Sequence, residues 1–302
     1  MTHPRLTLRH LQMVRAIAET GGVSAAASQV GLSQSALSHR LREAERLLGA
    51  PLFYRRQARL VPTHAGQRLL HAARVALGEI ERAEHDIDKL AVGIEHVVRL
   101  GHEAYGGYHW LPGFLARFRG EHPGIGIEII PDVSMSPFQA LREGTIDLSI
   151  VSGPVARPGI RALPLFTDGM CVVMPEDHPL AGHAWLAPAT IAAEPYVTYH
   201  TTPAGGREYE RVFARYRVMP TEVLRAGVTE AVVAFVRAGQ GITIMPRWTL
   251  APYLAQGGLA TAEVTRAGMR IDWQAVLRAD EAADSPAMRL ARALAAADLA
   301  AL

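Results

Sequence analysis

The stretch VSAAASQVGLSQSALSHRLREAERLL, residues 23–48, predicts two short helices joined by a tight turn. Ser24 and Ser33 precede the two helical runs and are good N-cap residues, because a serine hydroxyl can accept a hydrogen bond from a first-turn amide. Gly31 lies between the runs, where a turn needs unusual backbone angles. One face of the second run is apolar, because Leu37, Leu41, Ala44 and Leu48 recur three or four positions apart.

The other face of the second run carries hydrogen-bonding and basic side chains. Together with the cap residue Ser33 they form the candidate DNA-binding set of this helix, Gln34, Ser35, Ser38, His39 and Arg42. A helix that reads base edges in the major groove needs side chains of this kind. From these residues alone, an ordinary helical hairpin with a solvated polar face remains the alternative.

The sequence on either side of this pair favours DNA binding. Upstream, a first helix with an apolar face at Leu8, Leu11, Val14 and Ile17 can brace the pair, and Thr7 is its expected cap. Downstream, PLFYRRQARLVPT, residues 51–63, predicts two short strands around a basic tip. Arg55, Arg56 and Arg59 are candidates to hold DNA phosphates. A helix, a helix-turn-helix and a basic hairpin make a winged helix-turn-helix, which we assign to residues 1–62.

A long helix is expected next, over residues 63–92. Residues 63–91 contain no proline, and at about 1.5 Å per residue the helix would be about 40 Å long. An apolar seam with heptad spacing runs along it, interrupted by Glu84, at Leu70, Ala73, Leu77, Ile80, Ile87 and Ala91. Such a helix cannot bury its seam alone, so it packs either on its own chain or on a second copy.

From Val97 onward, short apolar strands alternate with helices, which is typical of an α/β fold. Strands are expected at 97–101, 125–130, 147–151, 171–174, 196–199, 222–225, 241–245 and 270–277, and helices at 110–119, 137–143, 207–216, 229–238 and 286–299. We expect two lobes with the second inserted into the first. Lobe I then comprises residues 93–163 and 268–302, and lobe II comprises residues 164–267.

Open α/β sheets bind ligands at the carboxyl ends of their strands. The candidate effector-binding residues of the first lobe are therefore His102, Glu103, Ala104, Tyr105, Ser134, Met135 and Ser152, and those of the second are Tyr199, Thr201, Thr202, Thr229 and Ile242. Their hydroxyls and the helix-starting amides near them can hold a carboxylate. For any single Ser or Thr the alternative is a helix cap.

Charge is divided unevenly along the 302 residues. The first 91 hold 13 of the 31 basic and 8 of the 29 acidic residues, a balance of +5, and the rest carry 18 against 21, a balance of −3. Only the first part suits a polyanion. Cys171 is the single cysteine, which is consistent with a reducing compartment. Because neither a signal peptide nor a membrane-spanning run is present, we expect a soluble, cytoplasmic protein with no membrane partner.

Residues 5–91 resemble the amino-terminal domain of the LysR-type transcriptional regulators. The family's motifs occur in order, as Gly21-Gly22, Ala25 to Ala27, Ser33 to Ser38, Leu48-Gly49, Leu52-Phe53 with Arg55, and Thr63 with Ala65-Gly66. The resemblance implies double-stranded promoter DNA, RNA polymerase and a second copy of the chain as partners, with subunits paired through the long helix and commonly assembled as homotetramers. It also implies a two-lobed effector domain of the periplasmic-binding-protein type, which takes a small-molecule effector and no cofactor.

The effector domain resembles the branch of the family that regulates methionine biosynthesis. GHEAYGGYHWLPGFLARF, residues 101–118, and VVMPEDHPLA, residues 172–181, carry this likeness, whereas residues 198–207 are not a close match. The resemblance implies homocysteine, or a related amino acid, as the effector. Glu103 would then be a partner for the ligand amine, and an ion pair with a neighbouring arginine is the alternative role.

Enzymatic function is the alternative of another class, since the chain has 13 histidines. The sequence contains no HExxH, paired CxxC, GxxxxGK or GxSxG motif. Neither His96, His102 and His109 nor His178 and His183 have the spacing of metal ligands. A free-standing solute-binding protein is the other alternative, but it would carry an export signal and no basic head. We therefore expect a regulator and not an enzyme.

Overall fold

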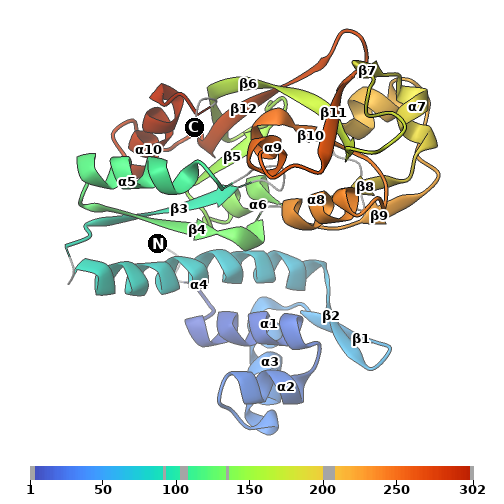
Figure 1. Cartoon of the computed structure of the whole chain (residues 1–302). Helices are drawn as coiled ribbons and strands as arrows, with labels where there is room; N and C mark the ends of the chain where they lie inside the picture. Colours follow the sequence, from blue (N-terminus) through green and yellow to red (C-terminus); the bar gives the residue numbers. More distant parts are fainter. Residues whose placement is uncertain (1–3, 91–92, 103–107, 134–135, 200–207, 300–302) are drawn as a thin grey trace. The chain divides into compact units, whose positions relative to one another are not determined.

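The structure is a computed structural model that describes residues 4–90, 93–102, 108–133, 136–199 and 208–299. The chain forms two compact units, residues 1–93 with 143–145, and residues 94–142 with 146–302 (Figure 1). Each unit has its own hydrophobic core and is described by itself.

The first unit begins with three helices, α1 (Leu8–Thr20), α2 (Val23–Gln29) and α3 (Gln34–Leu48). Thr7 is the N-cap of α1 as expected, and its backbone N–H donates to Nδ1 of His10 over 3.0 Å. The expected cap Ser33 is also confirmed, because its hydroxyl accepts from the amide of Ala36 over 3.2 Å. The prediction for Ser24 is wrong: α2 begins at Val23, with Gly22 as N-cap, so Ser24 lies inside the helix.

The predicted turn and apolar face of the helix pair are confirmed. Gly31 has a φ of +67°, in the left-handed region that favours glycine. Leu37 and Ala44 of α3 are fully buried, and Leu41 and Leu48 pack against the same core. This core also takes Met13, Val14 and Ile17 of α1. The helices are therefore held together by the periodic apolar positions.

The expected basic hairpin is present as β1 (Phe53–Arg56) and β2 (Arg59–Pro62). Arg56 pairs with Arg59 across a two-residue turn, in which Gln57 and Ala58 both have positive φ. Such a turn follows the right-handed twist of the flanking strands. The wing of the predicted winged helix-turn-helix thus forms.

The long helix α4 spans His64–Leu90, and Thr63 fixes its start. The Thr63 hydroxyl accepts from the amide of Gly66 over 3.0 Å and donates to the carbonyl of Pro51 over 2.7 Å. Gly66 is required here, because a Cβ at this position would collide with the carbonyl oxygen of Leu52. The cap and the close approach together lock α4 to the start of the wing.

The apolar seam of α4 changes character along its length. Leu70, Ala73 and Leu77 are buried, and α1 packs against α4 with an ion pair of 2.6 Å between Arg15 and Glu81. Further along, the apolar side chains are exposed, at 37% for Ile80, 63% for Ile87 and 55% for Leu90. Ala91 lies outside the described residues. The first half of the seam therefore packs on its own chain, as one of the two interpretations expects, and the second half does not.

The second unit is built on an eight-stranded mixed sheet in the order β4-β3-β5-β12-β6-β11-β7, with β10 paired to β6. The strands of the first lobe are β3 (His96–His102), β4 (Ile125–Ile130) and β5 (Leu148–Ser152), all parallel. Helices α5 (Leu111–Glu121) and α10 (Pro286–Ala296) pack on one core of this lobe, and α6 (Pro137–Arg142) packs on another. The 3-10 turn η1 (Pro131–Val133) follows β4.

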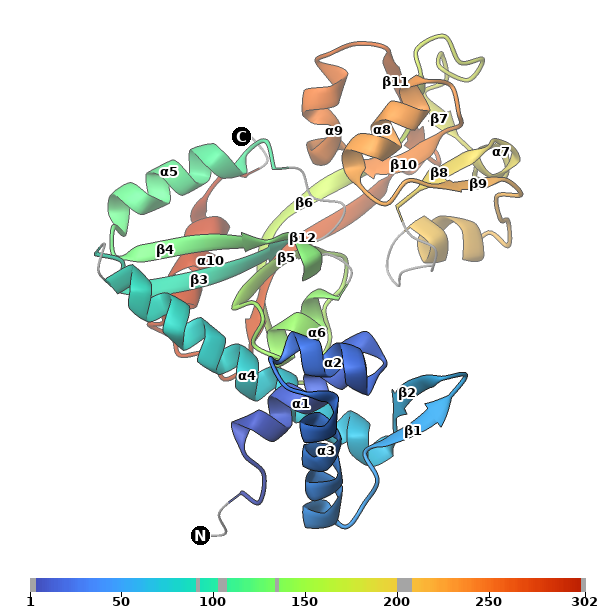
Figure 2. The same ribbon diagram turned by 90° about the horizontal axis from the view of Figure 1, so that it is seen from below.

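Two long antiparallel strands join the lobes, β6 (Ile160–Pro175) and β12 (Met269–Arg278), and both views show them side by side (Figure 2). The predicted strand at 171–174 is thus the end of a strand of 16 residues. The lobe boundary after residue 163 falls within this continuous strand, so the lobes share backbone hydrogen bonds.

The second lobe contains several elements that the sequence did not predict. These are β7 (Trp185–Leu186), α7 (Pro188–Ala193), α9 (Arg247–Leu254) and β11 (Leu259–Val264). The predicted ones are present as β8 (Tyr196–Thr198), β9 (Val223–Arg225), α8 (Thr229–Arg237) and β10 (Thr243–Pro246). The expected helix at 207–216 is instead a π-helical turn, η2 (Tyr209–Ala214), in which the amide of Arg215 donates to the carbonyl of Glu210 over 3.1 Å.

Candidate DNA-binding surface and effector site

The polar face of α3 is open to solvent. Gln34, Ser35, His39 and Arg42 are exposed and Ser38 is half-buried. Ser33 is also exposed, but its hydroxyl caps the helix and lies 3.0 Å from the hydroxyl of Ser35. The structure therefore gathers the predicted residues on one face while the opposite face fills the core.

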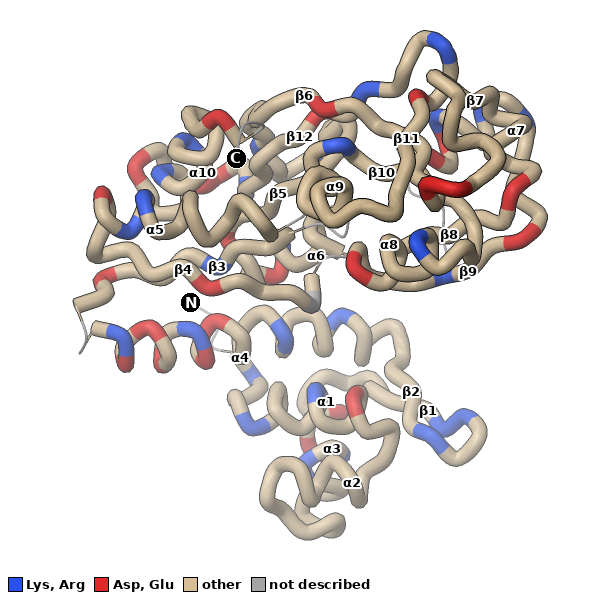
Figure 3. Tube along the Cα trace, viewed as in Figure 1, with Lys and Arg blue, Asp and Glu red and all other residues tan. Residues whose placement is uncertain are grey.

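The three arginines of the wing do not lie alike. Arg55 and Arg56 are exposed on β1, and the hairpin carries a cluster of positive charge (Figure 3). Arg59 is also exposed, but its guanidinium lies against Gly21, where a Cβ would be 2.7 Å from its Nε. Arg59 thus folds back toward the end of α1, so Arg55 and Arg56 are the freer candidates for phosphate contacts.

The described part of the chain holds five of the twelve candidate effector residues. Glu103, Ala104, Tyr105, Ser134, Met135, Thr201 and Thr202 lie outside the described residues. His102 and Ser152 end the neighbouring parallel strands β3 and β5, so they lie at the same edge of the sheet, as expected. Tyr199 and Thr229 are both buried in the second lobe, at the end of β8 and the start of α8.

His102 is surrounded by aromatic rings. Its ring centroid lies 5.1 Å from that of Tyr108, 6.4 Å from Trp110 and 6.5 Å from Trp273. Burial lowers the pKa of His102 to about 4, so the ring is neutral at pH 7. A neutral imidazole has one donor and one acceptor nitrogen, which suits a polar ligand group better than a bare anion.

Ile242 has a structural role, whereas Tyr199 and Thr229 offer buried hydroxyl groups. Ile242 is fully buried, its amide donates to the carbonyl of Pro195 over 2.8 Å, and its carbonyl accepts from Val197 over 2.9 Å. Its backbone is thereby committed to the core of lobe II. Burial raises the pKa of Tyr199, and the Thr229 side chain beside it acts in the opposite direction. The Tyr199 hydroxyl therefore stays neutral at physiological pH.

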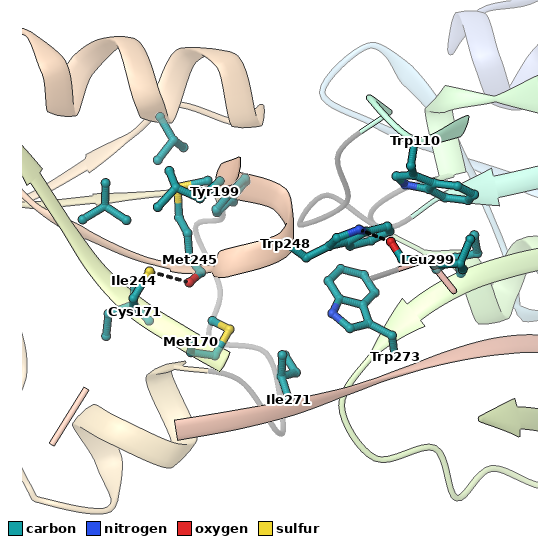
Figure 4. Close-up of a cluster of buried hydrophobic side chains, with 14 of the residues drawn as sticks. Trp110, Met170, Cys171, Tyr199, Ile244, Met245, Trp248, Ile271, Trp273 and Leu299 are labelled. Atoms are coloured by element: carbon teal, nitrogen blue, oxygen red, sulfur yellow. Dashed lines mark hydrogen bonds between the residues drawn. The ribbon is translucent and has the colours of Figure 1, made fainter. Parts of the chain in front are cut away.

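Two notable groups were not predicted from the sequence. Burial raises the pKa of the Glu208 carboxyl to about 7, and this residue directly precedes η2. An aromatic block forms where the lobes meet, with ring centroids 5.4 Å apart for Trp248 and Trp110 and 5.2 Å apart for Trp248 and Trp273 (Figure 4). No local pattern indicates the aromatic block, because it joins residues far apart in the chain.

Other chemistries find little support in the described residues. Cys171 is buried, which raises the pKa of its thiol to about 12 and leaves it unreactive. Within the described ranges no group of three or more His, Cys, Asp or Glu side chains is arranged to hold a metal ion. None of the described helices is both long and apolar enough to cross a membrane.

Comparison with known proteins agrees with this organisation. A family profile described as the LysR substrate binding domain matches residues 92–299, and one described as bacterial regulatory helix-turn-helix protein, lysR family, matches residues 8–67. The HTH-type transcriptional regulator MetR of Haemophilus influenzae is 29% identical over 276 residues, covering 91% of this chain and 89% of that protein.

Solved structures show the same fold. The regulatory domain of MetR from N. meningitidis is 24% identical in sequence and superposes with a TM-score of 0.57. The match covers 66% of this chain and 92% of that domain's chain. CbnR, a LysR family transcriptional regulator, is 20% identical in sequence and superposes with a TM-score of 0.70. This match covers 96% of the present chain and 98% of the CbnR chain. CbnR has also been solved in complex with its target DNA.

A winged helix-turn-helix, a long helix and a mixed α/β substrate-binding domain define a DNA-binding regulator. The chain belongs to the LysR family of bacterial transcriptional regulators, because the substrate-binding profile covers more than half of it. The members of this family are regulators and not enzymes, so the enzymatic alternative is set aside.

Proposed function

We propose that this chain binds promoter DNA through α3 and the wing, and that a small molecule held by the second unit controls this binding. The observation that carries the proposal is the exposed polar face of α3, positioned by the Ser33 cap and the buried Leu37. In this proposal Gln34, Ser35, Ser38, His39 and Arg42 approach the bases. Arg55, Arg56 and Arg59 contact phosphates. CbnR, which shares the fold, has been solved with its target DNA, and this supports DNA binding by the present chain.

We assign DNA binding to residues 1–62 and subunit pairing to residues 63–92. The exposed side chains of Ile80, Ile87 and Leu90 support pairing through α4, because a second copy can bury them. Two paired heads would bind successive half-sites, and a homotetramer would join two such dimers. RNA polymerase is the proposed protein partner at the promoter.

The proposed effector domain comprises lobe I, residues 93–163 and 268–302, and lobe II, residues 164–267. His102 and Ser152 from the first lobe and Tyr199 and Thr229 from the second support a site between the lobes, at the ends of β3, β5 and β8. Homocysteine, or a related amino acid, is the proposed effector, and the similarity to proteins named MetR supports testing it first.

One experiment tests the regulator. Genomic fragments from the source bacterium are incubated with the full chain, with and without homocysteine, and the retained fragments are sequenced. We expect a small set of sites whose occupancy changes with the effector. Retention without sequence preference in every condition would contradict the proposal. Calorimetric titration tests the ligand separately, and heat with another metabolite but none with homocysteine would overturn the effector assignment.

A further inference from the structure

A pocket of about 760 Å³ with several charged lining residues lies along the strands that join the two lobes. Its walls include Thr167 from β6, Arg270 and Asp272 from β12, and Arg211 and Arg215 from η2 and the residue after it. Thr167 pairs with Asp272 across the two strands, and Arg270 lies two residues from Asp272, so the three side chains share one face of the sheet. The volume is within the range typical of small-molecule sites.

The π-helical turn explains why η2 contributes to this pocket. Its hydrogen bond from the amide of Arg215 to the carbonyl of Glu210 places these two residues on successive turns, and both line the pocket. Arg211 ties the turn to β12, because its Nη1 donates to the carbonyl of Arg270. Single π-turns occur often at functional sites.

The charges of the lining favour an anion. Three guanidinium groups face two carboxylates, those of Glu210 and Asp272, which leaves a net charge of +1. The Asp272 carboxylate already accepts from the Thr167 hydroxyl over 2.7 Å. Within the described part of the chain, the guanidinium groups of Arg215 and Arg270 form neither a hydrogen bond nor a salt bridge, and Arg215 lies over the ring of Tyr216 at 5.9 Å.

We propose that this pocket binds a small metabolite with two or more carboxylate or phosphate groups, held by Arg215 and Arg270. The planar guanidinium group matches both kinds of anion through paired hydrogen bonds. Of the described effector candidates, His102, Ser152, Tyr199, Thr229 and Ile242, none lines this pocket, so the proposal concerns residues outside that set. Pro154, which follows β5 of the first lobe, also lines it. A ligand here contacts segments of both lobes and shifts the equilibrium between lobe angles if it prefers one of them.

Calorimetric titration of the full chain tests the site, with citrate and pyrophosphate as the carboxylate and phosphate probes. We expect saturable binding of one probe per chain, weakened at least tenfold when Arg215→Gln and Arg270→Gln are combined. Asp272→Asn removes a negative charge but keeps an oxygen for Thr167, so it is expected to tighten binding severalfold. Arg266→Gln, at an exposed arginine outside the pocket, is the matched control and keeps wild-type affinity.

Three results would overturn the proposal. These are non-saturable binding of both probes, an equal loss of affinity in Arg266→Gln, and wild-type affinity in the double variant. The substituted guanidinium groups are exposed and make no hydrogen bonds within the described residues, so we expect the variants to fold. A thermal melt of each variant checks this. The titration needs no DNA, so its outcome is separate from that of the promoter experiment.

Discussion

The indole N–H of Trp248 donates to the backbone carbonyl of Leu299 over 2.7 Å (Figure 4). Trp248 lies in the first turn of α9, and its own amide donates to the Asp168 carboxylate of β6 over 2.9 Å. Its ring also packs edge-on against Phe166, with centroids 4.8 Å apart. One residue thus joins the second lobe, a connecting strand and the C-terminal segment.

Trp248→Phe is expected to lower the free energy of unfolding by about 1–3 kcal/mol, because the buried carbonyl of Leu299 loses its donor. Urea unfolding of the full chain, followed by circular dichroism, measures the change. Trp185→Phe is the matched control, since Trp185 is 44% exposed. Equal stability losses in the two variants would show that the hydrogen bond contributes nothing specific.

Two glycines of α4 are expected to respond in opposite directions to alanine. Gly66→Ala should destabilise the first unit by more than about 2 kcal/mol, because the new Cβ collides with the backbone carbonyl of Leu52. Gly78→Ala meets only the end of the Arg82 side chain at 3.4 Å, so it should stabilise α4 by about 0.5–1 kcal/mol. Chemical denaturation of both variants provides the comparison, and a neutral Gly66→Ala would refute the close approach.

The buried His102 should make stability depend on pH. Its pKa is lowered to about 4 in the folded chain and is about 6.5 when unfolded, so the unfolded state binds more protons between these values. The free energy of unfolding therefore falls as the pH drops from about 6.5 toward 4. At pH 5 the loss is about 2 kcal/mol relative to pH 7.5.

His102→Phe removes this titrating group, so its stability should decline less over the same pH range. Urea unfolding at pH 7.5 and pH 5 gives the two slopes. His39→Gln, at an exposed histidine, should keep the wild-type profile. Parallel profiles for the wild type and His102→Phe would mean that other groups dominate the acid response.

The first unit could be predicted closely because its signals are local. The spacing of Leu37 and Ala44 fixes the buried face of α3, and the Ser33 cap fixes its start. The wing could be predicted from a basic tip that lies between two short apolar runs. The exception, Ser24, shows that a good cap residue does not decide where a helix begins when Gly22 can adopt the extended conformation.

The second unit could be predicted only in part, because its organisation is non-local. Residues 160–170 of β6 include Pro164 and Gly169 and lack clean alternation, yet they pair with residues of β12 that lie 99 to 118 positions further along the chain. Pro252 lies inside α9, and because proline is unfavourable within a helix, the sequence did not predict a helix there. The arginines of the pocket along β6 and β12, and the tryptophans of the aromatic block, come together only through this topology.

The exposed half of α4 should control the oligomeric state. Ile87 is 63% exposed, and Ile87→Glu would place a charge in the proposed seam, so we expect dissociation to monomers. Light scattering after size-exclusion chromatography measures the mass. His85→Glu adds the same side chain at an exposed position off the seam and should leave the assembly intact. Unchanged mass in Ile87→Glu would place the subunit interface elsewhere.

Gln34 and Arg55 should affect DNA binding in different ways. Gln34 lies on the exposed face of α3, and Gln34→Ala should reduce discrimination at the base pairs it reads by about 1–3 kcal/mol. Arg55 lies on the wing, and Arg55→Ala should weaken binding to specific and random DNA alike. It should also reduce the slope of log affinity against log salt concentration by about one unit, because one phosphate contact and its released counterion are lost.

Fluorescence anisotropy at several salt concentrations, with a specific and a scrambled duplex, separates these effects. Arg46→Ala is a control, since Arg46 is exposed in the last turn of α3 and belongs to neither candidate set. The division requires that the ratio of specific to random affinity fall for Gln34→Ala and hold for Arg55→Ala. If both variants lose the same fraction of affinity on both duplexes with unchanged salt slopes, α3 does not read bases and the wing does not contact phosphates.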